Sequence, residues 1–289
     1  MAAAGITDVP GAVAAAMSVA LELGLPAEMA VVVHESNRLA VRLLPADVLA
    51  RVAPEGHHSA QFEVDLATRL ARTDSPAAPL DPRVEPRVHR RDDVAITIWT
   101  WFDTDPSANI APSAYAGALD RLHAGLRSID LPTPHFLDRV REAEAIVVSR
   151  ESSPDLTEAD RELLLGTFES TTQAIAGRGA SEQPLHGEPH PGNVLNAKGG
   201  PLFIDLETCC RGPIEFDLAH VPTAVSDAYP NADLELVNTC RLLVLAMVAA
   251  WRFEHGDLFP NREAAARGLL AALRAGPPYP TLGEVSSIE

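Results

Sequence analysis

The sequence is poor in cysteine, and its cysteines form no recognisable metal or redox centre. The 289 residues contain Cys209, Cys210 and Cys240, with no CxxC pair and no His/Cys cluster at the spacing of a zinc site. A sparse, odd-numbered set is typical of a reducing compartment, where disulfides are rare. We therefore expect a cytoplasmic protein whose cysteines are small buried apolar groups.

Basic residues are also scarce. The chain has 23 Lys and Arg against 40 Asp and Glu, which gives a net charge of −17. Proteins that bind nucleic acid usually carry a basic face, so this balance argues against a nucleic-acid partner. The acidic excess either attracts a cationic substrate or simply keeps the protein soluble.

The sequence shows no signal peptide and no charge-free apolar run as long as a bilayer is thick. The alanine-rich N-terminus lacks the basic region of a signal peptide and is interrupted by Asp8 and Pro10. The longest apolar run without charge, residues 242–251, is far shorter than the roughly 20 residues of a membrane-spanning helix. We expect no membrane partner. Apolar residues make up 46% of the sequence, enough for a core, and the length suits two domains better than one.

Hydrophobic periodicity divides the chain into a strand-rich first part and a helical remainder. In the first part we expect a helix over 10–23, a hairpin of 30–34 and 39–44, a strand over 48–52, a helix over 59–72, a proline-rich loop over 74–86 and a strand over 94–99. Helices prevail from Pro112 onwards and include a long apolar one over 234–253. We predict a β-rich lobe over residues 1–102 and a larger helical lobe over 103–289.

The densest group of polar side chains lies in residues 186–193. Two prolines and Gly192 exclude a regular helix there, so these residues form a loop that holds its side chains in fixed directions. A short hairpin over 194–204 follows the loop, and Asp205 stands at the end of its second strand.

These side chains have the chemistry that phosphoryl transfer requires. Magnesium prefers oxygen ligands, which the amide of Asn193 and the carboxylate of Asp205 can supply. Glu188 lies on the same loop as Asn193 and can receive the proton of an attacking hydroxyl. The simpler alternative is a turn whose Asn and Asp side chains satisfy backbone groups. The whole ordered set favours the chemical interpretation.

Three motifs resemble those of one enzyme family. His186-Gly-Glu188-x-His-x-x-Asn193 resembles the His-Gly-Asp-x-x-x-x-Asn catalytic loop of aminoglycoside phosphotransferases and choline-kinase-like enzymes. Asp205-Leu-Glu207 resembles their Asp-Phe-Glu/Asp metal segment. Residues 212–219, Gly-Pro-Ile-Glu-Phe-Asp-Leu-Ala, resemble the Gly-Pro-x-x-x-Asp-Leu-Ala continuation. With the β-rich lobe, the resemblance covers most of the chain.

The resemblance implies an α+β, two-lobed, protein-kinase-like fold with a small β-rich lobe and a larger helical lobe. It implies Mg2+ held by Asn193 and Asp205 with Glu207 as a helper, and ATP or GTP as the co-substrate. Glu188 takes the catalytic position that orients the acceptor hydroxyl. The implied acceptor is a hydroxylated small molecule. Because of the acidic balance we expect a cationic one, such as an aminoglycoside or another amino-sugar antibiotic.

The resemblance also places nucleotide contacts in the first lobe. Arg51 on the third strand is expected to contact phosphates and to pair with Glu63 on the following helix, and an ordinary surface ion pair is the equally weighted alternative. The hairpin tip around Ser36 and Asn37 resembles the loop that covers the nucleotide, although it lacks the kinase glycines.

Two departures from the family pattern leave other functions open. Glu188 replaces the usual catalytic aspartate, and Arg51 stands where kinases carry a lysine. An inactive, regulatory pseudokinase that still binds nucleotide is therefore the main alternative. A hydrolase that uses paired carboxylates on water ranks last. Near the end of the long apolar helix, a polar cluster of Glu254, His255 and Asp257 belongs either to the acceptor site or to a solvated helix end.

Overall fold

The computed structural model describes residues 6–36, 38–55, 59–104 and 109–286. Contacts divide the chain into two compact units. Unit 1 comprises Met1–Asn109 and Val194–Glu207, and unit 2 comprises Ile110–Asn193 and Thr208–Glu289. The division of the chain into lobes at residue 102 stays a prediction. By contacts, residues 103–109 and the 194–207 segment go with the first unit.

Unit 1 is built on a five-stranded antiparallel sheet with the strand order β1-β2-β3-β5-β4. Its elements are α1 (Val9–Glu22), β1 (Ala27–Glu35), β2 (Leu39–Pro45), β3 (Val48–Pro54), α2 (Ser59–Leu70), β4 (His89–Arg91) and β5 (Val94–Thr100). The expected helices, hairpin and strands of this region are confirmed. The short strand β4 was not expected.

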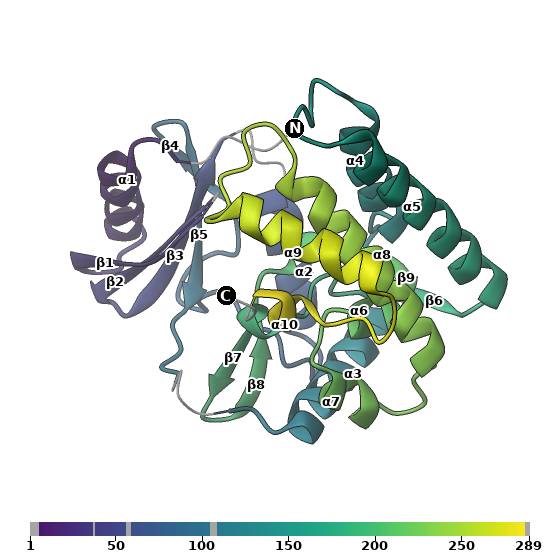
Figure 1. The fold of residues 1–289 in the computed structure, drawn as a ribbon. Coiled ribbons are helices and arrows are strands. Elements are labelled where there is room, and N and C mark those ends of the chain that lie inside the picture. Colours follow the sequence, from purple (N-terminus) through teal and green to yellow (C-terminus); the bar gives the residue numbers. More distant parts are fainter. Residues whose placement is uncertain (1–5, 37, 56–58, 105–108, 287–289) are drawn as a thin grey trace. The chain divides into compact units, whose positions relative to one another are not determined.

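Strand alternation decides which face of the sheet carries polar groups. On β3, Val48, Ala50 and Val52 are fully buried and pack with the alanine-rich face of α1 (Figure 1). Because successive side chains on a strand point to opposite faces, Arg51 lies on the other face. Its register partners are Ala40 on β2 and Thr97 on β5. The polar face of the sheet therefore centres on Arg51.

The second piece of unit 1 is the predicted hairpin, formed by β7 (Val194–Ala197) and β8 (Gly200–Phe203). The proline-rich loop 74–86 lies against it, since the amide of Ala78 donates to the carbonyl of Phe203 at 2.8 Å. Two residues after β8, Asp205 has a left-handed backbone with φ 64°. Aspartate tolerates this conformation better than most residues. The hairpin thus sets where the Asp205 carboxylate points.

Unit 2 is mainly helical. Its elements are α3 (Pro112–Ser128), α4 (Phe136–Val148), α5 (Glu158–Arg178), β6 (Glu182–Leu185), β9 (Cys210–Pro213), α6 (Ile214–Leu218), α7 (Thr223–Ala228), α8 (Leu234–Arg252), α9 (Arg262–Ala275) and α10 (Leu282–Ser286). Its core lies between α4, α5, α8 and α9, around fully buried aromatic residues such as Phe136, Phe168 and Phe216. Within the described residues, α8 alone is long and apolar enough to cross a membrane, but 61% of its apolar window is buried. That burial is typical of a core helix in a soluble protein.

Candidate active site

Unit 1 gathers four of the predicted nucleotide and metal residues into one ion-pair cluster, namely Arg51, Glu63, Asp205 and Glu207. Arg51 donates from Nη1 to Glu63 Oε1 and from Nη2 to Asp205 Oδ1, the latter at 2.7 Å. The amide of Leu206 also donates to Glu63 Oε1 at 3.2 Å. Glu63 is only 1% exposed, so its pair with Arg51 is not a loose surface contact. The helix, the third strand and the metal segment therefore meet at Arg51.

A second arginine completes this cluster. Arg38, at the start of β2, donates to Glu63 Oε2 at 3.2 Å and pairs with Glu207 through Nη2. Ser59 links Arg38 to Glu207, since its hydroxyl accepts from Arg38 Nη2 at 2.6 Å and donates to Glu207 Oε2 at 2.8 Å. The sequence analysis missed Arg38. The strand period was the available signal, because Arg38, Ala40 and the register partner Arg51 fall on the same face of the sheet.

The electrostatics of the two arginines differ. Burial and the neighbouring charge of Arg51 lower the pKa of Arg38. Burial also acts to lower the pKa of Arg51, but the carboxylates of Glu63 and Asp205 outweigh it and raise that pKa. Arginine stays protonated at neutral pH in either case, so both side chains are cations, and Arg51, which also contacts Asp205 of the metal segment, is the candidate partner for a phosphate. The chain's single lysine, Lys198, lies in the turn between β7 and β8, so no lysine stands on β3.

The metal segment offers a suitable donor set for magnesium. The side chains of Asp205 and Glu207 keep 31% and 16% of their surface exposed. No group of three or more His, Cys, Asp or Glu that could hold a metal occurs among the described residues. Magnesium does not require one, because it commonly uses one or two carboxylates together with waters and substrate phosphates. The two carboxylates therefore fit the ion.

The predicted nucleotide-covering tip is described only in part. Ser36 closes the end of the β1–β2 hairpin, where its amide donates to the carbonyl of Arg38 at 2.8 Å. Asn37 lies outside the described residues. The role of both residues in covering the nucleotide stays a prediction.

In unit 2, the loop of residues 186–193 is anchored at its base by Asp217. Both carboxylate oxygens of Asp217 accept backbone amides, from His186 and from Gly187, each at 2.8 Å. His123 Nε2 lies 2.9 Å from Asp217 Oδ2. Burial acts to raise the pKa of Asp217, but His123 and the amides outweigh it and lower that pKa. Asp217 therefore stays ionised and fixes the loop backbone.

Gly187 lets the loop pass close to its neighbour. Its φ of 93° lies in the region that favours glycine, and a Cβ there would stand 2.0 Å from the carbonyl oxygen of Thr208. Farther along the loop, the side-chain amide of Asn193 donates to the carbonyl of Glu188 at 3.0 Å. This bond fixes the orientation of the Asn193 side-chain amide on the loop.

Glu188 carries the carboxylate that the sequence analysis places in the catalytic position. Arg139 on α4 donates to Glu188 Oε1, and its guanidinium lies 5.0 Å from the centre of the Trp251 ring. Burial acts to raise the pKa of Glu188, but the charge of Arg139, with help from His220, outweighs it and lowers that pKa. The Glu188 carboxylate is therefore ionised, and its hydrogen bond with Arg139 fixes its orientation. The sequence analysis missed Arg139, which lies 49 residues before Glu188 on a separate helix.

We expect Arg139 to be a positioning residue. Arg139→Met should lower kcat about tenfold to a hundredfold, since small displacements of a catalytic group are costly, while KM for the nucleotide stays unchanged. Arg139→Lys should restore part of the rate. Arg141→Met, on the same helix but in an exposed pair with Asp138, serves as the matched control. Steady-state kinetics at saturating nucleotide measure this, and an unchanged kcat in Arg139→Met would exclude the role.

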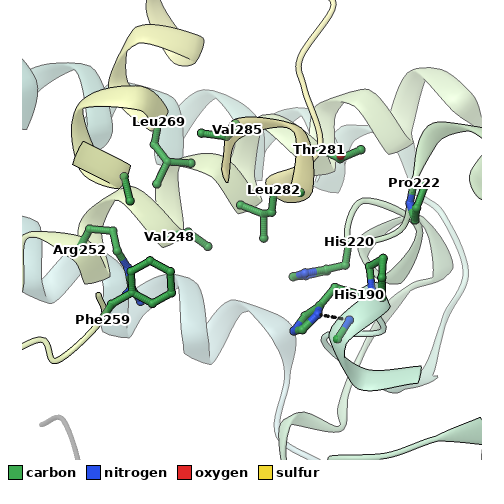
Figure 2. A pocket seen from close by; sticks show the side chains of 14 residues that line it. His190, His220, Pro222, Val248, Arg252, Phe259, Leu269, Thr281, Leu282 and Val285 are labelled. Carbon is green, nitrogen blue, oxygen red and sulfur yellow. Dashed lines mark hydrogen bonds between the residues drawn. The ribbon is translucent and has the colours of Figure 1, made fainter. Parts of the chain in front are cut away.

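A cavity of about 390 Å3 opens beside the catalytic loop within unit 2 (Figure 2). His190, Pro191 and Gly192 of the loop form one wall. Residues of α8, α9 and α10 and the ring of His220 form the others. The predicted polar cluster of Glu254, His255 and Asp257 does not line it.

Comparison with known proteins identifies the same family that the sequence motifs resemble. Residues 31–239, more than half of the chain, match the family described as APH, the phosphotransferase enzyme family. A comparison with curated protein sequences gives no match.

Solved structures of small-molecule kinases share the fold. The amicoumacin kinase hAmiN in complex with AMP-PNP, Ca2+ and Ami aligns with a TM-score of 0.70 and 11% identity, covering 93% of this chain and 96% of that chain. APH(2")-IIia with GDP and kanamycin gives 0.61 and 13%, covering 89% and 91%. A choline/ethanolamine kinase family protein from Mesorhizobium loti gives 0.61 and 13%, covering 94% and 99%. The predicted α+β, two-lobed, protein-kinase-like fold is confirmed.

Proposed function

Because the chain belongs to the phosphotransferase enzyme family and acts on hydroxyl groups of small molecules, we propose that it is a kinase that uses the γ-phosphoryl of ATP or GTP. The observation that supports this most is the cluster around Arg51. A firmly charged cation on β3 is fixed there by a buried glutamate and touches the aspartate of the metal segment. Phosphoryl transfer depends on such positioning and charge placement more than on covalent chemistry.

The proposal assigns a role to the predicted catalytic residue and to each predicted metal ligand. Glu188 accepts a hydrogen bond from the acceptor hydroxyl and then its proton, as the hydroxyl oxygen bonds to the γ-phosphorus and the bond to the β-phosphate oxygen breaks. Asn193, Asp205 and Glu207 would hold Mg2+, which would supply positive charge to neutralise the phosphates. A carboxylate of lowered pKa can still serve as this proton acceptor, because in a loose transition state the hydroxyl is oriented first and its proton is removed late.

Arg51 provides the test of the nucleotide site. Arg51→Ala should weaken binding of magnesium-ATP by about 1.5–3 kcal/mol, the value of a charge-assisted hydrogen bond. Arg42→Ala is the matched control, because Arg42 lies on the same sheet in an exposed pair with Asp47. Calorimetric titration of both variants with ATP and with GTP also reads the nucleotide preference. Equal affinities of wild type and Arg51→Ala for magnesium-ATP would show that Arg51 has only a structural role.

A pseudokinase is the second candidate. It is favoured by the ion pairs that engage both metal-segment carboxylates, Asp205 with Arg51 and Glu207 with Arg38, and by the pair of Glu188 with Arg139. In a pseudokinase these pairs persist and nucleotide binds without turnover. Acceptor-dependent ADP release separates the two candidates, since only the kinase produces it.

The acceptor and the cellular compartment complete the proposal. The net charge of −17 supports a cationic acceptor, such as an amino-sugar antibiotic, with a role in antibiotic resistance. The sparse cysteines, all buried and free, support a cytoplasmic location. The net charge describes the whole surface, whereas the cavity beside the catalytic loop describes the local environment of a bound acceptor.

A further inference from the structure

The cavity beside the catalytic loop is walled mainly by apolar side chains. Val248 of α8, Leu269 of α9, and Leu282 and Val285 of α10 face His190 and His220 across it in Figure 2. Phe259 is 49% exposed at its edge, and the neighbouring Leu258 is 82% exposed. Exposed apolar side chains beside an apolar cavity mark a ligand-binding surface more often than chance exposure does.

The charges of this cavity do not suit a cation. No carboxylate is among its described lining residues. The charged group that lines it is Arg252, whose guanidinium stacks 4.1 Å from the centre of the Phe259 ring and pairs with Asp257 at 3.1 Å. An ammonium group placed against this lining would lose its hydration and would meet the Arg252–Asp257 ion pair in place of an unpaired carboxylate.

His220 is a buried polar group in the lining of this cavity. It is 5% exposed, and neither ring nitrogen has a hydrogen-bond partner among the described residues. Burial lowers its pKa to about 4, against the opposing charges of Glu188 and Asp217. The neutral ring has one donor and one acceptor nitrogen. Figure 2 shows it pointing into the cavity.

His220 also lies next to the reacting end of the loop. Its ring lines the same cavity as His190, which lies two residues after Glu188 on the loop. Its own amide donates to the carbonyl of Asp217, the residue that anchors the loop, at 3.0 Å. A ligand held by the His220 ring is therefore held close to the catalytic carboxylate.

We infer that the cavity is an acceptor subsite for an apolar, uncharged or anionic body, and that His220 binds a polar group of this acceptor and positions its hydroxyl toward Glu188. The inference rests on the proposed kinase function, and it favours apolar acceptors over the cationic amino-sugars that the net charge suggests. His220 is a positioning residue, and Glu188 remains the catalytic one.

Three acceptors that share one sugar test the substrate class. Phenyl β-glucoside carries an apolar body, glucosamine an ammonium group, and glucose neither. With wild-type enzyme and magnesium-ATP, we expect kcat/KM for phenyl β-glucoside to exceed that for glucosamine by at least tenfold. This follows from burial of an aryl group against the cost of an unpaired ammonium. Kanamycin is the cationic reference. A higher kcat/KM for glucosamine or kanamycin overturns the inference while it leaves the kinase proposal intact.

Variants of His220 test the positioning role. His220→Phe should raise KM for phenyl β-glucoside about tenfold, the loss of one neutral hydrogen bond, with KM for ATP unchanged. His220→Gln keeps a donor and an acceptor and should restore part of the affinity. His255→Phe, at an exposed position outside the cavity, is the control. An unchanged acceptor KM in His220→Phe overturns the assignment.

A binding measurement keeps the inference testable if none of these sugars is phosphorylated. The fluorescent probe 1-anilinonaphthalene-8-sulfonate combines an apolar body with an anionic group and should bind wild type. Phenyl β-glucoside should displace it, kanamycin should not, and Leu282→Glu should weaken it because a carboxylate then lines the cavity. Displacement by kanamycin, or equal probe affinity in Leu282→Glu, overturns the inference. Loss of nucleotide binding would instead count against the kinase proposal.

Discussion

Glu188→Gln should lower kcat by about a hundredfold to ten-thousandfold, the range that a positioned general base contributes. Glutamine keeps the size of the side chain and can still accept a hydrogen bond from its amide oxygen, but it cannot take the hydroxyl proton. It also weakens the ion pair with Arg139 that fixes the carboxylate. Binding of the nucleotide should remain as in wild type. Steady-state phosphorylation of an accepted substrate measures the effect.

Two further variants sharpen this result. Glu188→Asp restores the family's usual residue but withdraws the carboxylate by about one bond, roughly 1.5 Å. We expect it to lower kcat by about a hundredfold, because the loop and Arg139 are adjusted to the longer side chain. Glu182→Gln, an exposed carboxylate on β6 that pairs with His135, is the control. Full activity in Glu188→Gln would remove Glu188 from the mechanism.

Asp205→Asn should reduce turnover by about a thousandfold and weaken binding of magnesium-ATP. A metal ion contributes several kcal/mol of charge stabilisation to the transition state, and Asp205 is its proposed charged ligand. Asparagine preserves the shape of the side chain and tolerates the left-handed backbone of this position. Calorimetric titration with magnesium-ATP and with ATP in the presence of a chelator separates the metal effect from nucleotide affinity.

The chain contains a closely matched control for Asp205. Asp47 also has a left-handed backbone, with φ 56° against 64° for Asp205. Its Oδ1 accepts from Arg42 at 2.7 Å, as that of Asp205 does from Arg51. Asp47→Asn should change neither nucleotide binding nor turnover. If both variants behave alike, the contribution of Asp205 is structural and the metal assignment is wrong.

Much of the fold could be predicted from the sequence because the decisive signals were local patterns of residues. The alternation on β3 separates Arg51 from the buried Val48, Ala50 and Val52, and the spacing of apolar residues defines α2 and α8. The prolines and glycines of the catalytic loop were equally informative, since each restricts the backbone on its own. Family motifs then supplied the protein-kinase-like arrangement that periodicity alone cannot provide.

The missed residues are those whose role depends on contacts distant in sequence. Arg139 reaches Glu188 from another helix, and Arg38 reaches Glu207 across 169 positions of the chain. No local pattern marks Arg139, and the strand period puts Arg38 on the same face as Arg51 without indicating its partner Glu207. The cavity beside His220 is invisible for the same reason, because it is assembled from the catalytic loop and three helices.

The acidic total shows how a whole-chain property differs from a local one. A net charge of −17 is spread over the surface, where it favours solubility and attracts cations at long range. Affinity for a bound molecule depends on the groups that touch it after water has left. The lining of the cavity therefore has more weight than the net charge in the choice of acceptor.

Mass spectrometry of the acceptor after incubation with magnesium-ATP tests the central claim most directly, when ADP is measured in the same sample. For the wild-type protein we predict an acceptor that has gained one phosphoryl group, with an equal amount of ADP, and neither product for Asp205→Asn. ADP without a phosphorylated acceptor would indicate a hydrolase. Nucleotide binding with neither product, across acceptors of every charge class, would contradict the account and indicate a pseudokinase.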